Sequence, residues 1–190
     1  MDDAESLRWE TDSREIAYTC PGFEIHHEAV TLPDGTETDF DFLHDEPSVV
    51  ILPFTPDGEF VLVEEWRQAV KGLTCSFPAG GVEPGEDLQA AASRELTEET
   101  GYEAAQIEPL DSFEPATGIS DAVFHYFVAT GCRATGSQDL DGDESIRVQT
   151  HEPEWLLDQV LAGELRDGRT ALGLLRYVAD RTELSVPRPE

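Results

Sequence analysis

The sequence predicts an α/β protein, because segments typical of buried strands and segments typical of helices both occur along its 190 residues. Two near-continuous apolar runs, residues 48–54 and 60–66, are typical of strands buried on both faces. Residues 86–101 begin with two acidic residues and end in a glycine, as expected for a helix and its two ends. Residues 153–162 and 170–181 predict two further helices.

The first 45 residues predict a small β-rich section in front of the main domain. The turn residues Pro33-Asp34-Gly35 separate the last two of its strand candidates. The candidates are residues 16–20, 23–32 and 36–43. We therefore expect a β-rich section over residues 1–45, a main domain over 46–182 and a loose tail over 183–190.

The two apolar runs of the main domain are joined by the turn-forming residues Thr55-Pro56-Asp57-Gly58. This arrangement predicts a hairpin between them. Shorter strand candidates follow along the chain at residues 74–77, 102–107, 110–113, 122–130 and 145–148. The main domain is thus expected to contain both strands and helices around one core.

Three glutamates of the first predicted helix, Glu95, Glu98 and Glu99, fall on one side when the helix is drawn at about 100° per residue. Apolar residues share that side, and the opposite side carries only neutral polar residues: Gln89, Ser93, Thr97 and Thr100. Ionised carboxylates that face an interior must be protonated, paired with arginine or bound to a cation. The pattern favours a Mg²⁺ or Mn²⁺ site, although a solvated acidic face is the alternative.

The segment that contains this helix resembles the signature box of the Nudix hydrolases. Gly80 is followed after five residues by Glu86, and after seven more by Arg94-Glu95-Leu96-x-Glu98-Glu99-x-Gly101. Tyr102 departs from the small aliphatic residue that usually ends the box. The resemblance implies an α/β/α sandwich with a mixed β-sheet. It also implies Mg²⁺-dependent hydrolysis of a nucleoside diphosphate linked to another group.

The resemblance also implies roles for individual residues. The Ala79 carbonyl would bind metal together with Glu95, Glu98 and Glu99. Glu98 and Glu99 would also take part in catalysis. Four other residues of the box would orient the loop and the glutamates without touching the reacting atoms; they are Gly80, Glu86, Arg94 and Gly101.

Outside the box, the chain is most similar to the ADP-ribose pyrophosphatase branch of the family. Glu64-Glu65-Trp66-Arg67 resembles a segment in which the arginine would bind a substrate phosphate; a surface salt bridge of Arg67 is the alternative. Glu144 would be the general base, with Asp143 or Glu98 as alternatives. Ala116 stands where this branch has the proline linked to ADP-ribose specificity, so the substrate is less certain than the chemistry.

ADP-ribose, split into AMP and ribose 5-phosphate, is the substrate that this resemblance favours. Another nucleotide sugar or a dinucleotide is the alternative within the same chemistry. A Nudix regulator that binds a nucleotide without cleaving it is a second class of function, and an acidic structural protein without metal is a third. The full carboxylate set favours the enzyme.

The composition is strongly acidic, with 12 Lys and Arg residues against 41 Asp and Glu residues and a net charge of −29. Such a surface repels nucleic acid and anionic membranes. It predicts adaptation to a halophilic cytoplasm, and an acidic interaction protein from an ordinary cytoplasm is the alternative. The three cysteines are widely spaced and predict neither a disulfide framework nor a zinc site. With no apolar signal segment or membrane-spanning run, we expect a cytoplasmic protein, and the resemblance implies a homodimer.

Overall fold

The computed structural model describes residues 5–140, 142 and 145–182. Contacts between Cα atoms divide the chain into two compact units. The first contains residues 1–47 and 114–123, and the second contains residues 48–113 and 124–190. Each unit is described by itself below. Within the described residues, no helix is long and apolar enough to cross a membrane.

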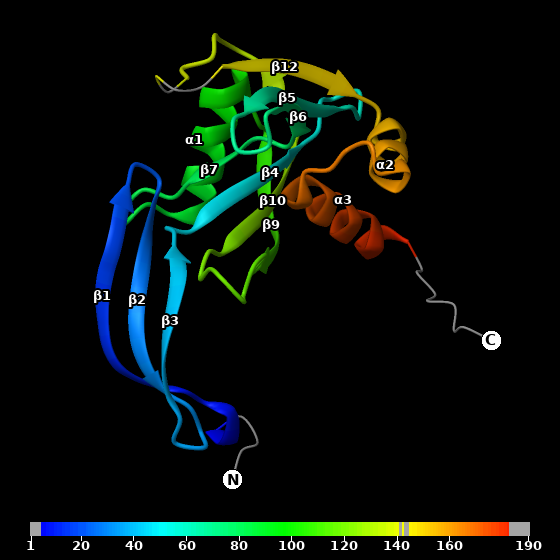
Figure 1. Ribbon diagram of the computed structural model, residues 1–190. Helices are drawn as coiled ribbons and strands as arrows, with labels where there is room; N and C mark the ends of the chain where they lie inside the picture. Colours follow the sequence, from blue (N-terminus) through cyan, green and yellow to red (C-terminus); the bar gives the residue numbers. More distant parts are fainter. Residues whose placement is uncertain (1–4, 141, 143–144, 183–190) are drawn as a thin grey trace, which may run out of the picture. The chain divides into compact units, whose positions relative to one another are not determined.

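The first unit is built around an antiparallel sheet of three strands in the order β1-β2-β3 (Figure 1). A short 3-10 helix, Glu5–Leu7, precedes the sheet. The strands are β1 (Glu10–Cys20), β2 (Phe23–Thr31) and β3 (Glu37–His44). β1 begins six residues earlier than the sequence predicted, because its polar N-terminal half also pairs with β2, with a shift of register between Thr11 and Ser13, in spite of its exposure.

Alternate residues of β2 are buried, and one of them is charged. Glu28 is 7% exposed, forms an ion pair with Arg14 and accepts a hydrogen bond from the Thr11 hydroxyl at 3.2 Å. The segment 114–123 joins this unit through a bridge between Ser120 and Leu43. A hydrogen bond of 2.6 Å between His44 Nδ1 and Asp121 Oδ2 supports the same junction.

In the second unit, the residues that the structure describes form three sheets and three helices. The largest sheet has the order β7-β4-β10-β9, and it is mixed because β4 and β10 run parallel while the other pairs are antiparallel. Its strands are β4 (Ser48–Pro53), β7 (Ala79–Gly81), β9 (Gln106–Phe113) and β10 (Phe124–Thr130).

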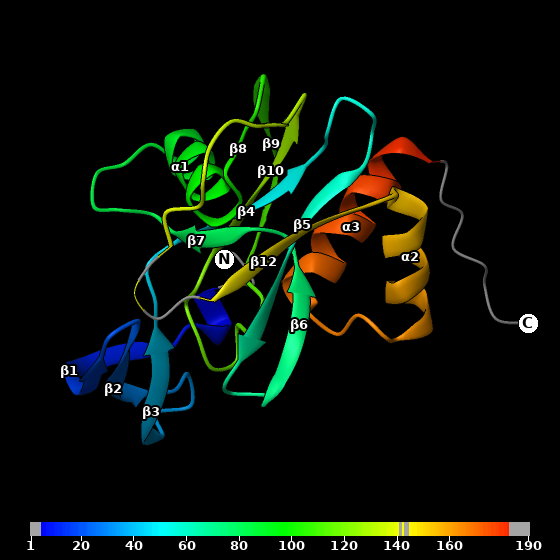
Figure 2. The ribbon, with the colours of Figure 1, turned by 90° about the horizontal axis from the view of Figure 1, so that it is seen from above.

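A second sheet has the order β12-β5-β6, and a two-stranded ribbon pairs β8 with β11. The bounds are β5 (Phe60–Arg67), β6 (Gly72–Ser76), β8 (Tyr102–Glu103), β11 (Arg133–Ala134) and β12 (Ile146–His151). The helices are α1 (Leu88–Thr100), α2 (Pro153–Ala162) and α3 (Gly168–Arg181). Within this unit, the strands lie between α1 on one side and α2 and α3 on the other (Figures 1 and 2).

Two hydrophobic clusters fill this layered arrangement, one on each side of β4. Val49 and Ile51 pack with Ala91, Ala92 and Leu96 of α1. The alternate residues of β4 face the other way and pack with β5, α2 and α3; this cluster includes Val50, Leu52, Phe60, Leu62, Leu156 and Leu174. β4 is buried from Val49 to Pro53 and β5 from Phe60 to Val63, so the prediction of strands covered on both faces is correct for most of β4 and for the first half of β5.

The predicted hairpin between residues 48–54 and 60–66 is wrong. β4 is paired with β10 and β7, whereas β5 is paired with β12 and β6, so the two strands belong to different sheets. Only an isolated bridge joins Phe54 to Phe60. The turn signal was correct, but it could not show that the chain changes sheets at the turn.

The segment 102–113 also differs from the two short strands predicted there. Tyr102–Glu103 forms β8, and Gln106–Phe113 is one strand at the edge of the mixed sheet. Pro109 lies inside this strand beside an irregularity in its pairing with β10. An edge strand tolerates proline because one of its sides needs no backbone donor.

Burial of the Thr170 hydroxyl predicts a large effect of removing it. Thr170 is 0% exposed, donates to Asp167 Oδ1 at 2.7 Å and accepts from the Phe77 amide at 3.0 Å. We expect Thr170→Val to lower the free energy of unfolding by about 1–3 kcal/mol, because the buried Phe77 amide loses its partner. Chemical denaturation measures this. Thr130→Val, at an exposed strand end, is the control and should change stability by less than about 0.5 kcal/mol.

The His44–Asp121 contact predicts a pH dependence. The hydrogen bond that His44 donates to the Asp121 carboxylate raises the pKa of His44 above its ordinary value. This contribution to stability is therefore complete below the unfolded-state pKa of about 6.5 and is lost as the pH rises through the higher folded-state pKa. An NMR titration should give His44 a pKa above about 6.5, and Asp121→Asn should lower it. A wild-type pKa at or below that value would contradict the assignment.

Candidate metal and catalytic site

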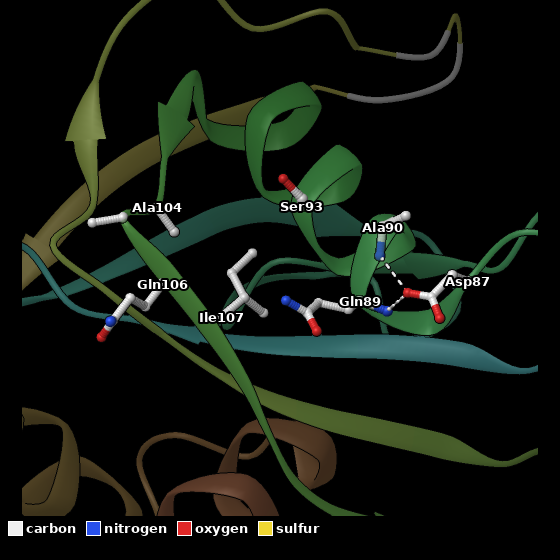
Figure 3. Close-up of a pocket in the computed structure, with 8 residues that line it drawn as sticks. Asp87, Gln89, Ala90, Ser93, Ala104, Gln106 and Ile107 are labelled. Atoms are coloured by element: carbon white, nitrogen blue, oxygen red, sulfur yellow. Dashed lines mark hydrogen bonds between the residues drawn. The ribbon is translucent and has the colours of Figure 1, made fainter.

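Helix α1 is fixed at both ends by its own sequence. At the start, Asp87 Oδ1 accepts hydrogen bonds from the amides of Gln89 at 3.0 Å and Ala90 at 3.2 Å (Figure 3). At the end, Gly101 adopts a left-handed conformation with φ of 71°, and its amide donates to the Thr97 carbonyl at 2.8 Å. These two caps fix where α1 begins and ends, and thereby the positions of the glutamates along it.

The guanidinium of Arg94 connects the loop before α1 to the helix itself. It donates to Glu86 at 2.9 and 3.0 Å and to the Gly81 carbonyl at 2.8 Å. It also donates to Glu95 at 2.7 Å and Glu98 at 3.0 Å. Arg94 lowers the pKa of Glu86, and Glu86 in turn raises the pKa of Arg94. One positive charge thus serves three carboxylates and leaves this cluster negative.

Glu95 lies directly against the backbone of the loop. A Cβ atom added at Gly80 would overlap the Glu95 carboxylate, whereas one added at Gly81 would meet nothing within 4 Å. The Glu95 side chain is only 12% exposed. Gly80 is therefore the residue that leaves room for Glu95 between the loop and the helix.

Glu99 reaches the strand that precedes the box. It is 4% exposed, and Glu99 Oε2 accepts a hydrogen bond from the Ala79 amide at 3.0 Å. Two residues predicted to hold a metal are thus adjacent. Two positions earlier, the backbone amide of Phe77 donates a hydrogen bond to the Thr170 hydroxyl of α3. The stretch from Phe77 to Ala79 is therefore bonded to α3 on one side and to α1 on the other.

The three predicted glutamates differ in burial. Glu99 is buried and Glu95 is largely buried, but the Glu98 side chain is 40% exposed. The prediction that the opposite side of the helix faces outward is wrong at Thr100, which is 6% exposed because its hydroxyl bonds to the Leu96 carbonyl and accepts from the Tyr102 amide. The alternative of a solvated acidic face does not describe Glu95 and Glu99.

Hard carboxylate oxygens beside one arginine fit Mg²⁺ or Mn²⁺ in donor chemistry. Among the described residues, no three acidic, histidine or cysteine side chains already converge as a ligand set. Glu95 and Glu98 are turned toward Arg94, and Glu99 toward Ala79. A cation at this site would draw these carboxylates together, and the surplus negative charge around Arg94 favours that change.

The segment after β11 is anchored to the C-terminal end of α1. The side-chain Nε2 of Gln138 donates to the backbone carbonyls of Glu99 at 2.6 Å and Ile146 at 3.3 Å. The backbone amide of Asp139 donates to the Glu98 carbonyl at 3.0 Å. Gly101 also contacts this segment, since a Cβ there would lie 2.7 Å from the Gly136 carbonyl oxygen. The two predicted general bases in this segment, Glu144 and Asp143, lie outside the described residues.

Arg67, the predicted phosphate ligand, forms an ion pair with Glu65 at 3.0 Å between Arg67 Nη2 and Glu65 Oε2. Glu65 is 9% exposed. Because side chains alternate along a strand, both residues lie on the face of β5 opposite to Leu62, which packs toward α2 and α3. Arg67 is thus occupied by Glu65, and its binding of a substrate phosphate stays a prediction.

A shallow cleft of about 420 Å³ runs along α1 and β9 (Figure 3). Its lining includes Asp87, Gln89 and Ser93 from the start of α1 and from α1 itself, and Ile107 from β9, as Figure 3 shows. It contains none of the predicted metal ligands. The candidate site is therefore defined by the contacts of Arg94, Glu95 and Glu99, and not by this cleft.

Three supporting residues were missed by sequence reasoning: Glu65, Gln138 and Thr170. Thr170 follows the helix-capping pattern Asp167-x-x-Thr170, in which Asp167 accepts from the Thr170 amide at 2.8 Å, and this signal was available. Gln138 carries no comparable local pattern, because it bonds to the Glu99 and Ile146 carbonyls in other parts of the chain. Glu65 is close in sequence to its partner Arg67, but nothing in the sequence indicates that Glu65 is buried.

Comparison with known proteins assigns the family. Residues 44–171 match the NUDIX domain, which is more than half of the chain. The chain belongs to the Nudix family. A relative from Bacillus methanolicus, a methanol dehydrogenase activator, is 31% identical over 146 residues, covering 76% of this chain and 79% of that protein.

An ADP-ribose pyrophosphatase from Bacillus subtilis (strain 168) is 29% identical over 171 residues, covering 90% of this chain and 92% of that protein. The crystal structure of an ADP compounds hydrolase superposes with a TM-score of 0.80 at 18% identity, covering 90% of this chain and 93% of that chain. This structure confirms the predicted Nudix α/β fold. The family and the pyrophosphatase relative support a Nudix pyrophosphohydrolase, as the box predicted.

Adjacent glycines of this Nudix box offer a matched test. We expect Gly80→Ala to displace the Glu95 carboxylate and to weaken Mn²⁺ binding by about tenfold or more, with little loss of melting temperature because the displaced group is the end of a flexible side chain. Gly81→Ala, which meets nothing within 4 Å, should bind Mn²⁺ like the wild type. Calorimetric titration with Mn²⁺ measures both. Equal affinities in the two variants would disprove the role of Gly80.

Proposed function

We propose that the chain hydrolyses ADP-ribose to AMP and ribose 5-phosphate with Mg²⁺ or Mn²⁺ bound at α1. The observation that carries the proposal is the charge balance around Arg94, which bonds to three carboxylates and leaves the cluster negative. This surplus suits a divalent cation that in turn attracts a diphosphate. The pyrophosphatase relative, whose name specifies ADP-ribose, supports this choice among nucleotide substrates.

The Ala79 carbonyl, Glu95, Glu98 and Glu99 would hold the cation. When bound, it neutralises the diphosphate and lowers the pKa of a coordinated water molecule. Arg94, Glu86, Gly80 and Gly101 keep the loop and helix in register for this site. Arg67 would bind a phosphate oxygen once it exchanges Glu65 for substrate.

A carboxylate must take the proton of the attacking water. Glu98 is the candidate among the described residues, because its side chain is the most exposed of the three glutamates and can reach solvent. Glu144 is the other candidate from the sequence. A homodimer in a salt-adapted cytoplasm stays a prediction, supported by exposed apolar residues of the first unit such as Ile16 and Tyr18, at 56% and 58% exposure, and by the net charge of −29.

Replacement of one carboxylate tests both the metal site and the activity. Glu99→Gln keeps an oxygen that can accept from the Ala79 amide, so the fold should survive while the charge is lost. We expect turnover of ADP-ribose to fall by about a hundredfold or more. Glu103→Gln removes an equal charge from an exposed strand position and should leave turnover unchanged.

The measurement is chromatographic detection of AMP from ADP-ribose with Mg²⁺, beside nucleotide sugars and dinucleotides. Preferred cleavage of another compound would identify that compound as the substrate and leave the proposed chemistry unchanged. Ala116 allows this outcome, because it replaces the proline linked to ADP-ribose specificity. If Glu99→Gln retains wild-type turnover on the preferred compound, the assigned site is wrong. If the folded protein binds ADP-ribose but cleaves none of the compounds, the alternative of a Nudix regulator that binds a nucleotide without cleaving it would be favoured.

A further inference from the structure

A second cleft lies on the other side of the sheet β12-β5-β6, away from α1. Its volume is about 910 Å³, which is within the range of small-molecule sites. The hairpin of β5 and β6 forms one wall, and α2 with the α2–α3 link forms the other. Glu64 and Cys75, which are paired across β5 and β6, line it, and strand alternation directs Glu64 opposite to Glu65. Arg67, the last residue of β5, also lines this cleft.

The balance of basic and acidic residues in this cleft differs from that of the whole chain. Three of the 12 basic residues line it, Arg67, Arg166 and Arg169, against three carboxylates. Elsewhere acidic residues dominate, because the whole chain has 41 of them. An anion would therefore meet less repulsion here than over most of the acidic surface.

Two of the three carboxylates already have partners. Glu64 is paired with Arg147 of β12, and Asp167 caps α3 through the Thr170 amide. Arg67 is likewise engaged by Glu65. The arginines that are left for a ligand are Arg166 of the α2–α3 link and Arg169 in the first turn of α3.

Arg166 is exposed and has no hydrogen bond or ion pair with any residue that the structure describes. Arg169 has its Nε at 3.7 Å from Asp167 Oδ2, which is too long for a hydrogen bond, and its guanidinium lies 5.9 Å from the centre of the Phe124 ring. Both guanidinium groups therefore keep donors for an anion. Planar guanidinium groups are the usual protein ligands of phosphate.

An aromatic surface lies beside these arginines. The Trp155 indole is stacked on His151, with 3.7 Å between ring centres and 13° between planes. This stack fixes the indole, yet Trp155 remains 36% exposed. Leu73 and Val70, at 64% and 71% exposure, extend the apolar surface of the same cleft. A flat ring can pack against such a surface at little entropic cost to the protein.

We propose that this cleft is a second ligand site, which binds an aromatic phosphate of nucleoside monophosphate size. Arg166 and Arg169 bind the phosphate, and Trp155 stacks on the ring. The site is separate from the carboxylates of α1, so it does not depend on which substrate is hydrolysed there. Its ligand could be a reaction product or an unrelated nucleotide, since the chemistry of recognition is the same.

The test is a titration of the full-length protein with AMP in EDTA, followed through the Trp155 indole signal in NMR spectra. That signal is assigned by its loss in Trp155→Phe. We expect a saturable shift with AMP, and weaker binding of adenosine and of ribose 5-phosphate, which each lack one half of the ligand. No shift of the Trp155 signal up to about 5 mM AMP would overturn the proposal.

Variants separate this site from the candidate active site. The double variant Arg166→Gln/Arg169→Gln should weaken AMP binding at Trp155 by about tenfold or more while ADP-ribose turnover is retained. Arg176→Gln is the matched control, because Arg176 also lies on α3 but does not line this cleft; it is paired with Asp111 of β9 and Asp180 of α3. This variant should bind AMP normally. If the double variant binds AMP as tightly as the control, the arginines do not form the site.

Discussion

Arg94 bonds to Glu86 and the Gly81 carbonyl in one segment and to Glu95 and Glu98 in the next. These four partners belong to a loop with little regular structure of its own and to a helix that carries several like charges. Without the guanidinium, the loop would lose its attachment and the carboxylates would repel one another. This shared cation therefore holds the loop against the helix at the place where the Glu95 carboxylate lies against the Gly80 backbone.

Much of this arrangement could be predicted from sequence because the interactions are local. Glu86, Arg94, Glu95 and Glu98 lie within thirteen positions of one another, so the spacing of a single loop and helix determines their geometry. The same holds for the buried strands β4 and β5, whose apolar runs identify them. Helix α2 was predicted with its observed bounds, since Pro153 and Gly163 mark its two ends.

Long-range pairing was beyond sequence reasoning. Nothing in residues 48–67 reveals that the chain leaves one sheet and enters another at the turn, because partners such as β10 and β12 lie far along the sequence. The ion pair between Glu65 and Arg67 is different, since both residues were in view but their burial was not. Burial decides whether such a pair is a surface contact or a competitor for substrate.

Gly101 has two neighbours at once: it ends α1 in a left-handed conformation, and it lies against the Gly136 backbone. The amides of Thr135 and Gly136 both point to the Gly101 carbonyl, at 3.0 and 3.4 Å. The Nudix box is one continuous segment of the sequence, but its last glycine is bonded to residues more than thirty positions downstream. Transfer of the box to another scaffold would require residues 135–139 to be transferred with it, because the C-terminal end of α1 forms its hydrogen bonds and close backbone contacts with that segment.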